Sequence, residues 1–140
     1  MIVVIDSGVW ISAIQFGGIP AKALELVTEV DDLAICSGIE QEVLRILEQK
    51  FGRDPKTIRF RMTPFWNSAI RAETTGQLKG ISRDPNDDFV IECAVKARAN
   101  ILISGDNDLL TLGRYEDCRI LTARQYLTER RLGQEILHPL

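Results

Sequence analysis

The chain has 140 residues, 45% of them hydrophobic, and a formal net charge of −3. This size fits a single domain over residues 1–140 with a buried core, and it leaves too little chain for a second domain. No stretch is apolar for long enough to span a membrane, and the first residues lack the basic and apolar regions of a signal peptide. We therefore expect a cytoplasmic protein without membrane attachment.

The three cysteines, Cys36, Cys93 and Cys118, are odd in number, lie in apolar segments and form no CxxC motif. This pattern indicates buried thiols rather than disulfides or a zinc site. The charged residues are unevenly distributed, since residues 45–83 carry nine basic and three acidic side chains, a local charge of +6 against −9 elsewhere. One surface that binds phosphates and another that gathers cations would give this asymmetry, and so would an ordinary solvated helical face.

The first half of the chain predicts alternating strands and helices. The apolar run Ile2–Ile5 is typical of a buried strand, and a short helix over residues 9–14 ends before Gly17 and Gly18. Pro20 begins a helix to about residue 30, and a second strand covers residues 33–37.

Ser37 and Glu40 match a capping box, which predicts a helix to about residue 50. Asp54 and Pro55 begin the basic segment 56–73, which Pro64 divides into two helices or bends. This segment belongs to a basic helical excursion over residues 51–80.

The second half continues the alternation after a polar loop over residues 74–83. It predicts a helix over 86–98, a strand over 101–103, a strand near 119–121, and a helix from Thr122 to about Arg131, followed by a tail over 132–140. This order predicts an α/β fold, a three-layer α/β/α sandwich with a central parallel sheet of four to five strands. In such sheets, ligands bind outside the carboxyl ends of the strands.

Several acids fall at that edge. Asp6 ends the first strand, where it either points into the crevice or caps the next helix. Glu42 lies at the edge of the apolar stripe of its helix, so it faces the crevice or forms an exposed flank charge. Asp87 shares a helix face with Ile91 and Ala94 and leans toward the crevice, unless the acids there only complement the helix dipole.

The neighbours of these acids have other predicted places. Asp84 is the expected helix cap, and Asp88 is expected to face water on the side of Glu92. Asp106 and Asp108 follow the strand over 101–103 and could share a cation, or serve only the turn. Ser7 and Ser104 could hold water or phosphate nearby. The lone histidine, His138, lies in the tail, so histidine-based catalysis is not expected.

Converging carboxylates without histidine or thiolate suit Mg²⁺, with Mn²⁺ as an alternative, because both ions prefer oxygen ligands. Such ions activate water and polarise a phosphodiester, which is nuclease chemistry. The candidate catalytic and metal-binding residues are Asp6, Glu42, Asp87 and Asp106, with Asp108 as a further ligand. The basic middle would hold the phosphates of RNA, and its candidate contacts are Lys50, Arg53, Lys56, Arg59 and Arg61.

Three strings, VVIDSGVWISA, EQEVLRIL and DPNDDFVIECAVKARANILISGDNDLL, resemble the PIN-domain family, most closely its branch of toxins from toxin–antitoxin pairs, the VapC-like ribonucleases. The resemblance places the family's four acids on Asp6, Glu42, Asp87 and Asp106. It implies a magnesium-dependent ribonuclease of single-stranded RNA that forms a homodimer and is silenced by a small antitoxin protein. Gly8 stands where the family commonly has Asn, which would lower activity.

Other functions stay open. The chain could process RNA as a housekeeping PIN nuclease, or it could be a non-catalytic PIN-like binding module that keeps the acids for its fold. Phosphoryl transfer through Asp6 is less consistent with the sequence, because Ser7 and Gly8 follow it without the second Asp of a DxDx[TV] motif.

Overall fold

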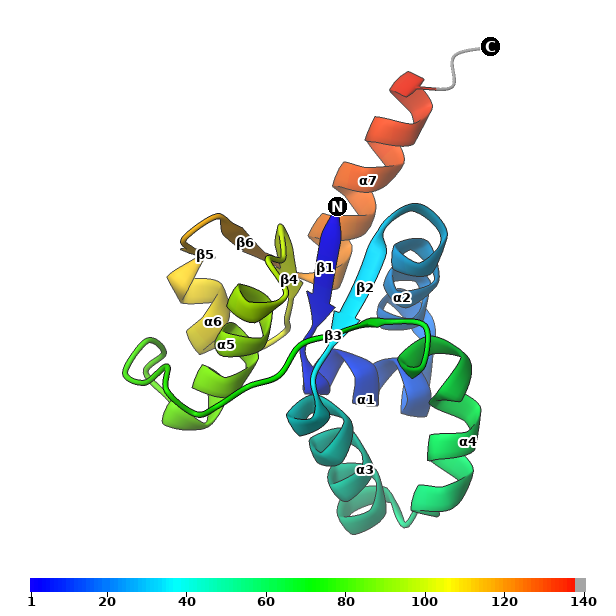
Figure 1. Ribbon diagram of the computed structural model, residues 1–140. Coiled ribbons are helices and arrows are strands. Elements are labelled where there is room, and N and C mark those ends of the chain that lie inside the picture. The colour runs from blue at the N-terminus through cyan, green and yellow to red at the C-terminus, as the bar shows by residue number, and fades with distance from the viewer. Residues whose placement is uncertain (138–140) are drawn as a thin grey trace.

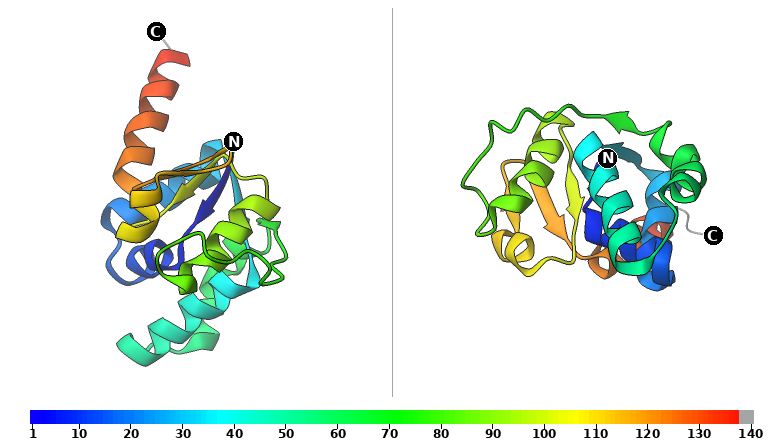
Figure 2. Two further views of the ribbon diagram at one scale, coloured as in Figure 1. Left: turned by 90° about the vertical axis from the view of Figure 1, so that its left-hand side faces the viewer. Right: turned by 90° about the horizontal axis from the view of Figure 1, so that it is seen from below.

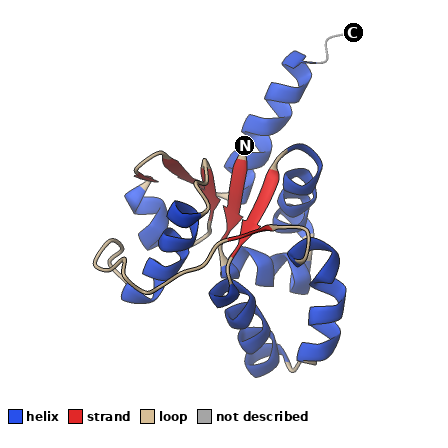
Figure 3. Cartoon of the chain, viewed as in Figure 1, coloured by secondary structure: helices blue, strands red, loops and turns tan. Residues whose placement is uncertain are grey.

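The computed structural model describes residues 1–137, with side chains described to residue 131. Within this range a six-stranded sheet lies between helices, so the predicted α/β sandwich is confirmed (Figures 1 and 3). The elements in chain order are β1 Ile2–Ile5, α1 Ser7–Phe16, α2 Gly18–Val30, β2 Asp32–Ile35, α3 Ser37–Phe51, α4 Pro55–Trp66, β3 Ile70–Arg71, the short 3₁₀ helix η1 Pro85–Asp87, α5 Asp88–Lys96, β4 Ile101–Ile103, α6 Asn107–Leu112, β5 Arg114–Tyr115, β6 Cys118–Leu121 and α7 Ala123–Leu137.

The strand order is β3-β2-β1-β4-β6-β5, so β1 lies inside the sheet, paired in parallel with β2 on one side and β4 on the other. The chain builds β2 and β3 outward from β1 in one direction and then returns to build β4 and β6 in the other. The order of the strands therefore reverses between β1 and β4, where open α/β sheets form a crevice at their carboxyl ends. The Asp6 amide donates to the Ile103 carbonyl at 2.9 Å, which holds the ends of these two strands together.

Helices cover both faces of the sheet. Helices α2 and α7 pack together on one face and α5 lies on the other, while α3 and α4 extend past the carboxyl ends of the strands (Figure 2). The rings of Trp10 in α1 and Trp66 in α4 meet edge to face at 6.0 Å, which ties α4 to the core. No helix within residues 1–137 has the length and apolar character needed to cross a membrane.

The sequence missed two strands. Strands β3 and β5 have two residues each, too few to show an alternating pattern, and β5 runs antiparallel to β6 at the sheet edge. The segment 56–73 was also only partly predicted. It forms a single helix, α4, that keeps Pro64 in its last turns, and the chain then enters β3.

The predicted capping box at Ser37 is wrong. Cys36 is the residue before α3 and makes no side-chain cap, and the buried Glu40 carboxylate pairs instead with the guanidinium groups of Arg71 and Arg59. A charged partner binds a carboxylate more strongly than a backbone amide does, so the ion pairs are preferred. At the other end of the chain Thr122 does form a capping box, with Gln125, but α7 continues to Leu137, past its predicted end. His138 lies outside the described residues.

Candidate functional site

Asp6 provides the first carboxylate of the site, directly after β1. Its Oδ1 atom accepts a hydrogen bond of 2.8 Å from the Ser7 amide and so caps α1, while its Oδ2 atom accepts one of 2.8 Å from the Ser104 hydroxyl. From the sequence, Asp6 either capped the next helix or pointed into the crevice. In the structure its side chain does both.

Ser104 links Asp6 to the next acid along the edge. Its hydroxyl is fully buried at the end of β4, donates to Asp6 and accepts a hydrogen bond of 3.0 Å from the Asp106 amide. Asp106 in turn caps α6, because its Oδ1 atom accepts from the amides of Asp108 at 2.8 Å and Leu109 at 3.3 Å. The Ser104 hydroxyl thus orients the Asp6 carboxylate and the backbone of Asp106 rather than standing free for phosphate.

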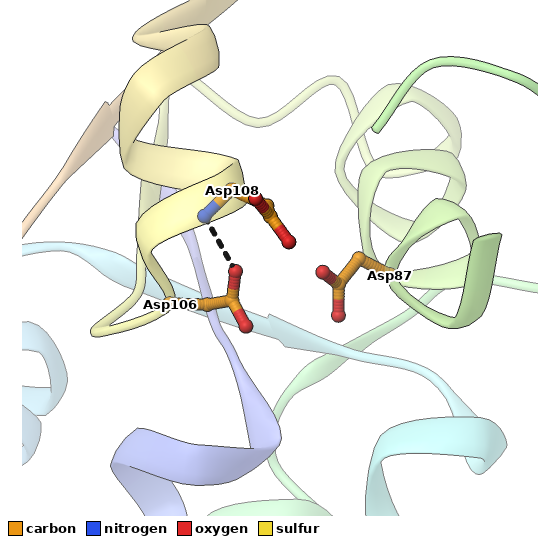
Figure 4. Close-up of side chains that lie close together, drawn as sticks. All are labelled: Asp87, Asp106 and Asp108. Carbon is orange, nitrogen blue, oxygen red and sulfur yellow. Dashed lines mark hydrogen bonds between the residues drawn. The ribbon is translucent and has the colours of Figure 1, made fainter. Parts of the chain in front are cut away.

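Asp87, Asp106 and Asp108 form a tight acidic cluster between η1 and α6 (Figure 4). Each offers one carboxylate oxygen, and these three oxygens lie within 4.8 Å of one another. One carboxylate oxygen of Asp87, Oδ2, is buried without a hydrogen-bond partner among the described residues. A buried carboxylate oxygen without a partner lowers the stability of the folded protein, and a bound cation would offset this cost.

The cluster opens onto a cleft of about 490 Å³ at the carboxyl ends of β1 and β4. Glu42, half-buried on α3, lines the same cleft, and so does Gly8 of α1. The structure therefore brings the four predicted acids into one space, whose polar lining comprises Asp6, Ser12, Glu42, Asp87, Ser104, Asp106 and Thr122. Ser7 is buried beside Glu42 and does not line the cleft.

Proton affinities in the cleft reflect this crowding. Burial and, after it, the charges of neighbouring carboxylates, Asp106 first among them, together raise the pKa of Asp87 to about 7. Burial also raises the pKa of Asp6, to which Asp106 adds, and that of Glu42, to which Asp6 adds. Each shift disfavours the ionised form, which a divalent cation would restore.

The side chains that could ligate a metal indicate which ion fits the cleft. It offers carboxylate oxygens from Asp6, Glu42, Asp87, Asp106 and Asp108 and neither imidazole nor thiolate, a set that suits Mg²⁺ or Mn²⁺ rather than zinc. The unpartnered Asp87 oxygen and the raised pKa values agree with this reading. The residues present therefore fit a hard divalent cation.

Two predictions for neighbouring residues need correction or addition. Asp88, expected to face water, is only 5% exposed, because it accepts hydrogen bonds from backbone amides of the preceding loop. Sequence reasoning also missed Arg83, whose Nε lies 3.2 Å from Asp108 Oδ1. The sequence does place Arg83 directly before the Asp84-Pro85 cap. It does not indicate that the side chain of Arg83 contacts Asp108, which lies 25 residues later.

The predicted RNA contacts lie outside the cleft, on α3, α4 and the turn between them. Lys50, Lys56 and Arg61 are exposed without an ion pair among the described residues. Arg53 is half-buried and donates to the Gln15 side chain at 2.8 Å, and Arg59 lies 3.8 Å from Glu40. The first three side chains are thus better placed for a ligand than the last two, and their role in RNA binding stays a prediction.

Comparisons with known proteins show the family and the fold of the chain. The sequence model of the PIN domain matches residues 2–108. Among solved structures, the VapBC2 complex from Rickettsia felis bound to a DNA fragment from its promoter contains a chain with a TM-score of 0.63 at 16% identity, covering 87% of this chain and 98% of that one. The PIN domain of RRP44 from T. brucei matches with a TM-score of 0.44 at 16% identity, covering 97% and 85%. No curated protein matches the chain in sequence.

Proposed function

The chain belongs to the PIN domain family, whose members are generally nucleases, and from that premise we propose that it is a magnesium-dependent endoribonuclease that cuts single-stranded RNA. The observation that supports this proposal most strongly is the cleft at the strand reversal, with carboxylates from four separate elements and one buried carboxylate oxygen that has no partner among the residues described. A purely structural role does not need acids gathered at such a cost.

The residues have distinct proposed roles. Asp6, Glu42, Asp87 and Asp106 would hold the metal, with Asp108 as a further ligand from the same cluster. When bound, the ion would lower the pKa of a water molecule and polarise the scissile phosphodiester. The Ser104 hydroxyl and the amides at the start of α1 and α6 fix two of the carboxylates in advance, so they need no reorganisation when substrate arrives.

We further propose that the chain is the toxin of a toxin–antitoxin pair, acting in the cytoplasm as a homodimer with a small antitoxin protein as partner. The structural match to a chain of the VapBC2 complex supports the PIN-like fold alone. The proposed toxin role rests on the resemblance of the sequence motifs to those of the VapC-like branch. A non-catalytic binding module is the second candidate, because Gly8 lines the cleft without a polar side chain at that position.

Cleavage of labelled single-stranded RNA in Mg²⁺, Mn²⁺ or EDTA tests the enzyme. Wild type should cut with either metal and stop in EDTA, and Asp87→Asn should lose at least about a hundredfold in rate, since it removes a metal ligand. Asp32→Asn, at an exposed position where β2 begins, is the matched control and should cut like wild type. A wild type that binds Mn²⁺ but cuts no RNA would favour the binding module.

A further inference from the structure

The loop between β3 and α5 is held in place by two buried carboxylates of α5. Glu92 is 2% exposed and accepts hydrogen bonds from the amide and hydroxyl of Thr75, from the Gly76 amide at 3.2 Å and from the Leu78 amide at 3.4 Å. This loop passes along the outside of the molecule toward η1 (tan in Figure 3). One carboxylate thus fixes its first half.

Asp88 fixes the second half of the loop. It accepts hydrogen bonds from the amides of Gly80 at 2.9 Å, Ile81 at 3.3 Å and Ser82 at 2.9 Å. Gly80 has a φ of 73°, a conformation that glycine adopts without strain. Buried carboxylates with this many backbone donors hold a defined loop conformation, and the residue that directly follows the last of these donors is Arg83.

Arg83 lies beside the acidic cluster of Asp87, Asp106 and Asp108. Its Nε atom is 3.2 Å from Asp108 Oδ1, so its guanidinium contacts the cluster formed with Asp87 and Asp106. The Arg83 side chain is 72% exposed and that of Asp108 is 34% exposed. Solvent screens such an exposed ion pair, so the pair contributes almost nothing to stability. The conformation of the loop does not depend on this pair, because Asp88 and Glu92 already hold the loop.

We propose that Arg83 leaves Asp108 when the metal binds and then contacts a phosphate of the RNA next to the scissile bond. This inference rests on the proposed nuclease function. The acids of the cleft repel a polyanion, and a guanidinium can bind a phosphate with two parallel hydrogen bonds, which its present contact through Nε to a single carboxylate oxygen does not offer. The fixed loop reduces the conformational entropy lost when Arg83 engages the strand.

The proposal predicts opposite effects on two ligands. Without Arg83, Asp108 loses a competing cation, so Mn²⁺ should bind about threefold more tightly. RNA should bind about tenfold more weakly, and the salt dependence of its affinity should become shallower by about 0.7, the change expected for one lost phosphate contact on a single strand. A purely structural role for Arg83 would not strengthen metal binding while weakening RNA binding.

The experiment compares Arg83→Gln with wild type for Mn²⁺ binding by calorimetry. RNA binding is measured with the same substitution in an Asp106→Asn background, which slows cleavage. Arg131→Gln, at an exposed position on α7, is the control and should change neither affinity. Tighter Mn²⁺ and weaker RNA binding with a shallower salt dependence would support the proposal. Unchanged RNA affinity, or weaker Mn²⁺ binding, would overturn it, whereas an Asp106→Asn parent that still binds Mn²⁺ but binds no RNA would remove the nuclease proposal as well.

A second variant tests the fixed loop. Glu92→Gln keeps the shape of the side chain and one acceptor oxygen, but it removes the charge and replaces the oxygen that accepts from the Leu78 amide with an NH2 group, which cannot accept a hydrogen bond. The KM for RNA should rise severalfold while Mn²⁺ affinity stays at the wild-type value, because Glu92 does not contact the acidic cluster. Equal loss of metal and RNA binding would show that the loop carboxylates act only on overall folding.

Discussion

Removing the charge of Asp87 should stabilise the metal-free protein, although it removes a metal ligand. The Asp87 carboxylate lies in a cluster with those of Asp106 and Asp108, and burial together with the neighbouring carboxylates raises its pKa from the ordinary 3.8 to about 7. Above about pH 7 the folded protein therefore holds an ionised carboxylate that it disfavours. Asp87→Asn keeps the size of the side chain without this charge.

The magnitude follows from the shift in pKa. Three pKa units correspond to a ceiling of about 4 kcal/mol, and solvent screening of a partly exposed carboxylate reduces this to about 1–2 kcal/mol. The sign follows from proton binding. Between about pH 4 and pH 7 the folded state keeps a proton that the unfolded state has lost, so the free energy of unfolding falls as pH rises through this window and levels off above it.

Urea unfolding in EDTA at about pH 5 and about pH 8 measures this effect. Asp87→Asn should exceed wild type in stability at the higher pH and approach it at the lower one. Saturating Mg²⁺ should reverse the order at the higher pH, because the wild type gains binding energy that the variant lacks. A variant that is less stable than wild type in EDTA at about pH 8 would refute the electrostatic account of the cleft.

Three further predictions concern other parts of the molecule. A Cβ at Gly8 would meet no atom within 4 Å, so Gly8→Asn should fit, raise stability by a few tenths of a kcal/mol through helix propensity and increase cleavage, as measured by urea unfolding and RNA assay. Glu40→Gln removes the charge of a buried carboxylate that pairs with two partly exposed arginines and should lower the free energy of unfolding by about 1–2 kcal/mol, whereas Glu48→Gln, exposed on the same helix, should change it by less than about 0.5 kcal/mol. Ser104→Ala removes the hydroxyl between Asp6 and Asp106 and should slow cleavage about tenfold at saturating RNA while RNA affinity is unchanged.

Each of these predictions has an outcome that would contradict it. A Gly8→Asn variant that cuts RNA more slowly would show that substrate binding needs a residue without a side chain at this position of the cleft. Equal stability of the Glu40 and Glu48 variants would mean that the ion pairs of Glu40 contribute nothing to holding α3, α4 and β3 together. A Ser104→Ala variant with wild-type rates would show that backbone amides alone orient the two carboxylates.

The four cleft acids were predictable because their positions follow from local pattern and topology. Asp6 ends a continuous apolar strand, and Asp106 follows another after a short turn, so a parallel sheet alone brings them to one edge. Glu42 and Asp87 were assigned from helical spacing to apolar neighbours, and the cleft includes both. Their roles as metal ligands stay predictions.

The partners of buried charges were not predictable in the same way. Asp88, Glu92 and Glu40 are all buried because distant segments supply their donors, either backbone amides of the loop or arginines beyond α3. Nothing in the sequence around a carboxylate shows whether such donors will fold over it. Helical spacing placed Asp88 on the side away from the cleft, which is correct, but that side is covered by the loop rather than by water.

Two adjacent carboxylates at the start of α5, those of Asp87 and Asp88, therefore have different surroundings. Asp87 faces the cleft with an unpartnered oxygen and a raised pKa, while Asp88 faces the loop with three amide donors. The loop that Asp88 holds carries Arg83 back to Asp108, beside Asp87. Asp87, a proposed metal ligand, and Arg83, the proposed phosphate contact, thus lie on one short segment, so a substitution that shifts the backbone here should alter metal and RNA binding together. A change confined to one side chain should separate the two, which is why Arg83→Gln and Asp87→Asn are expected to change metal affinity in opposite directions.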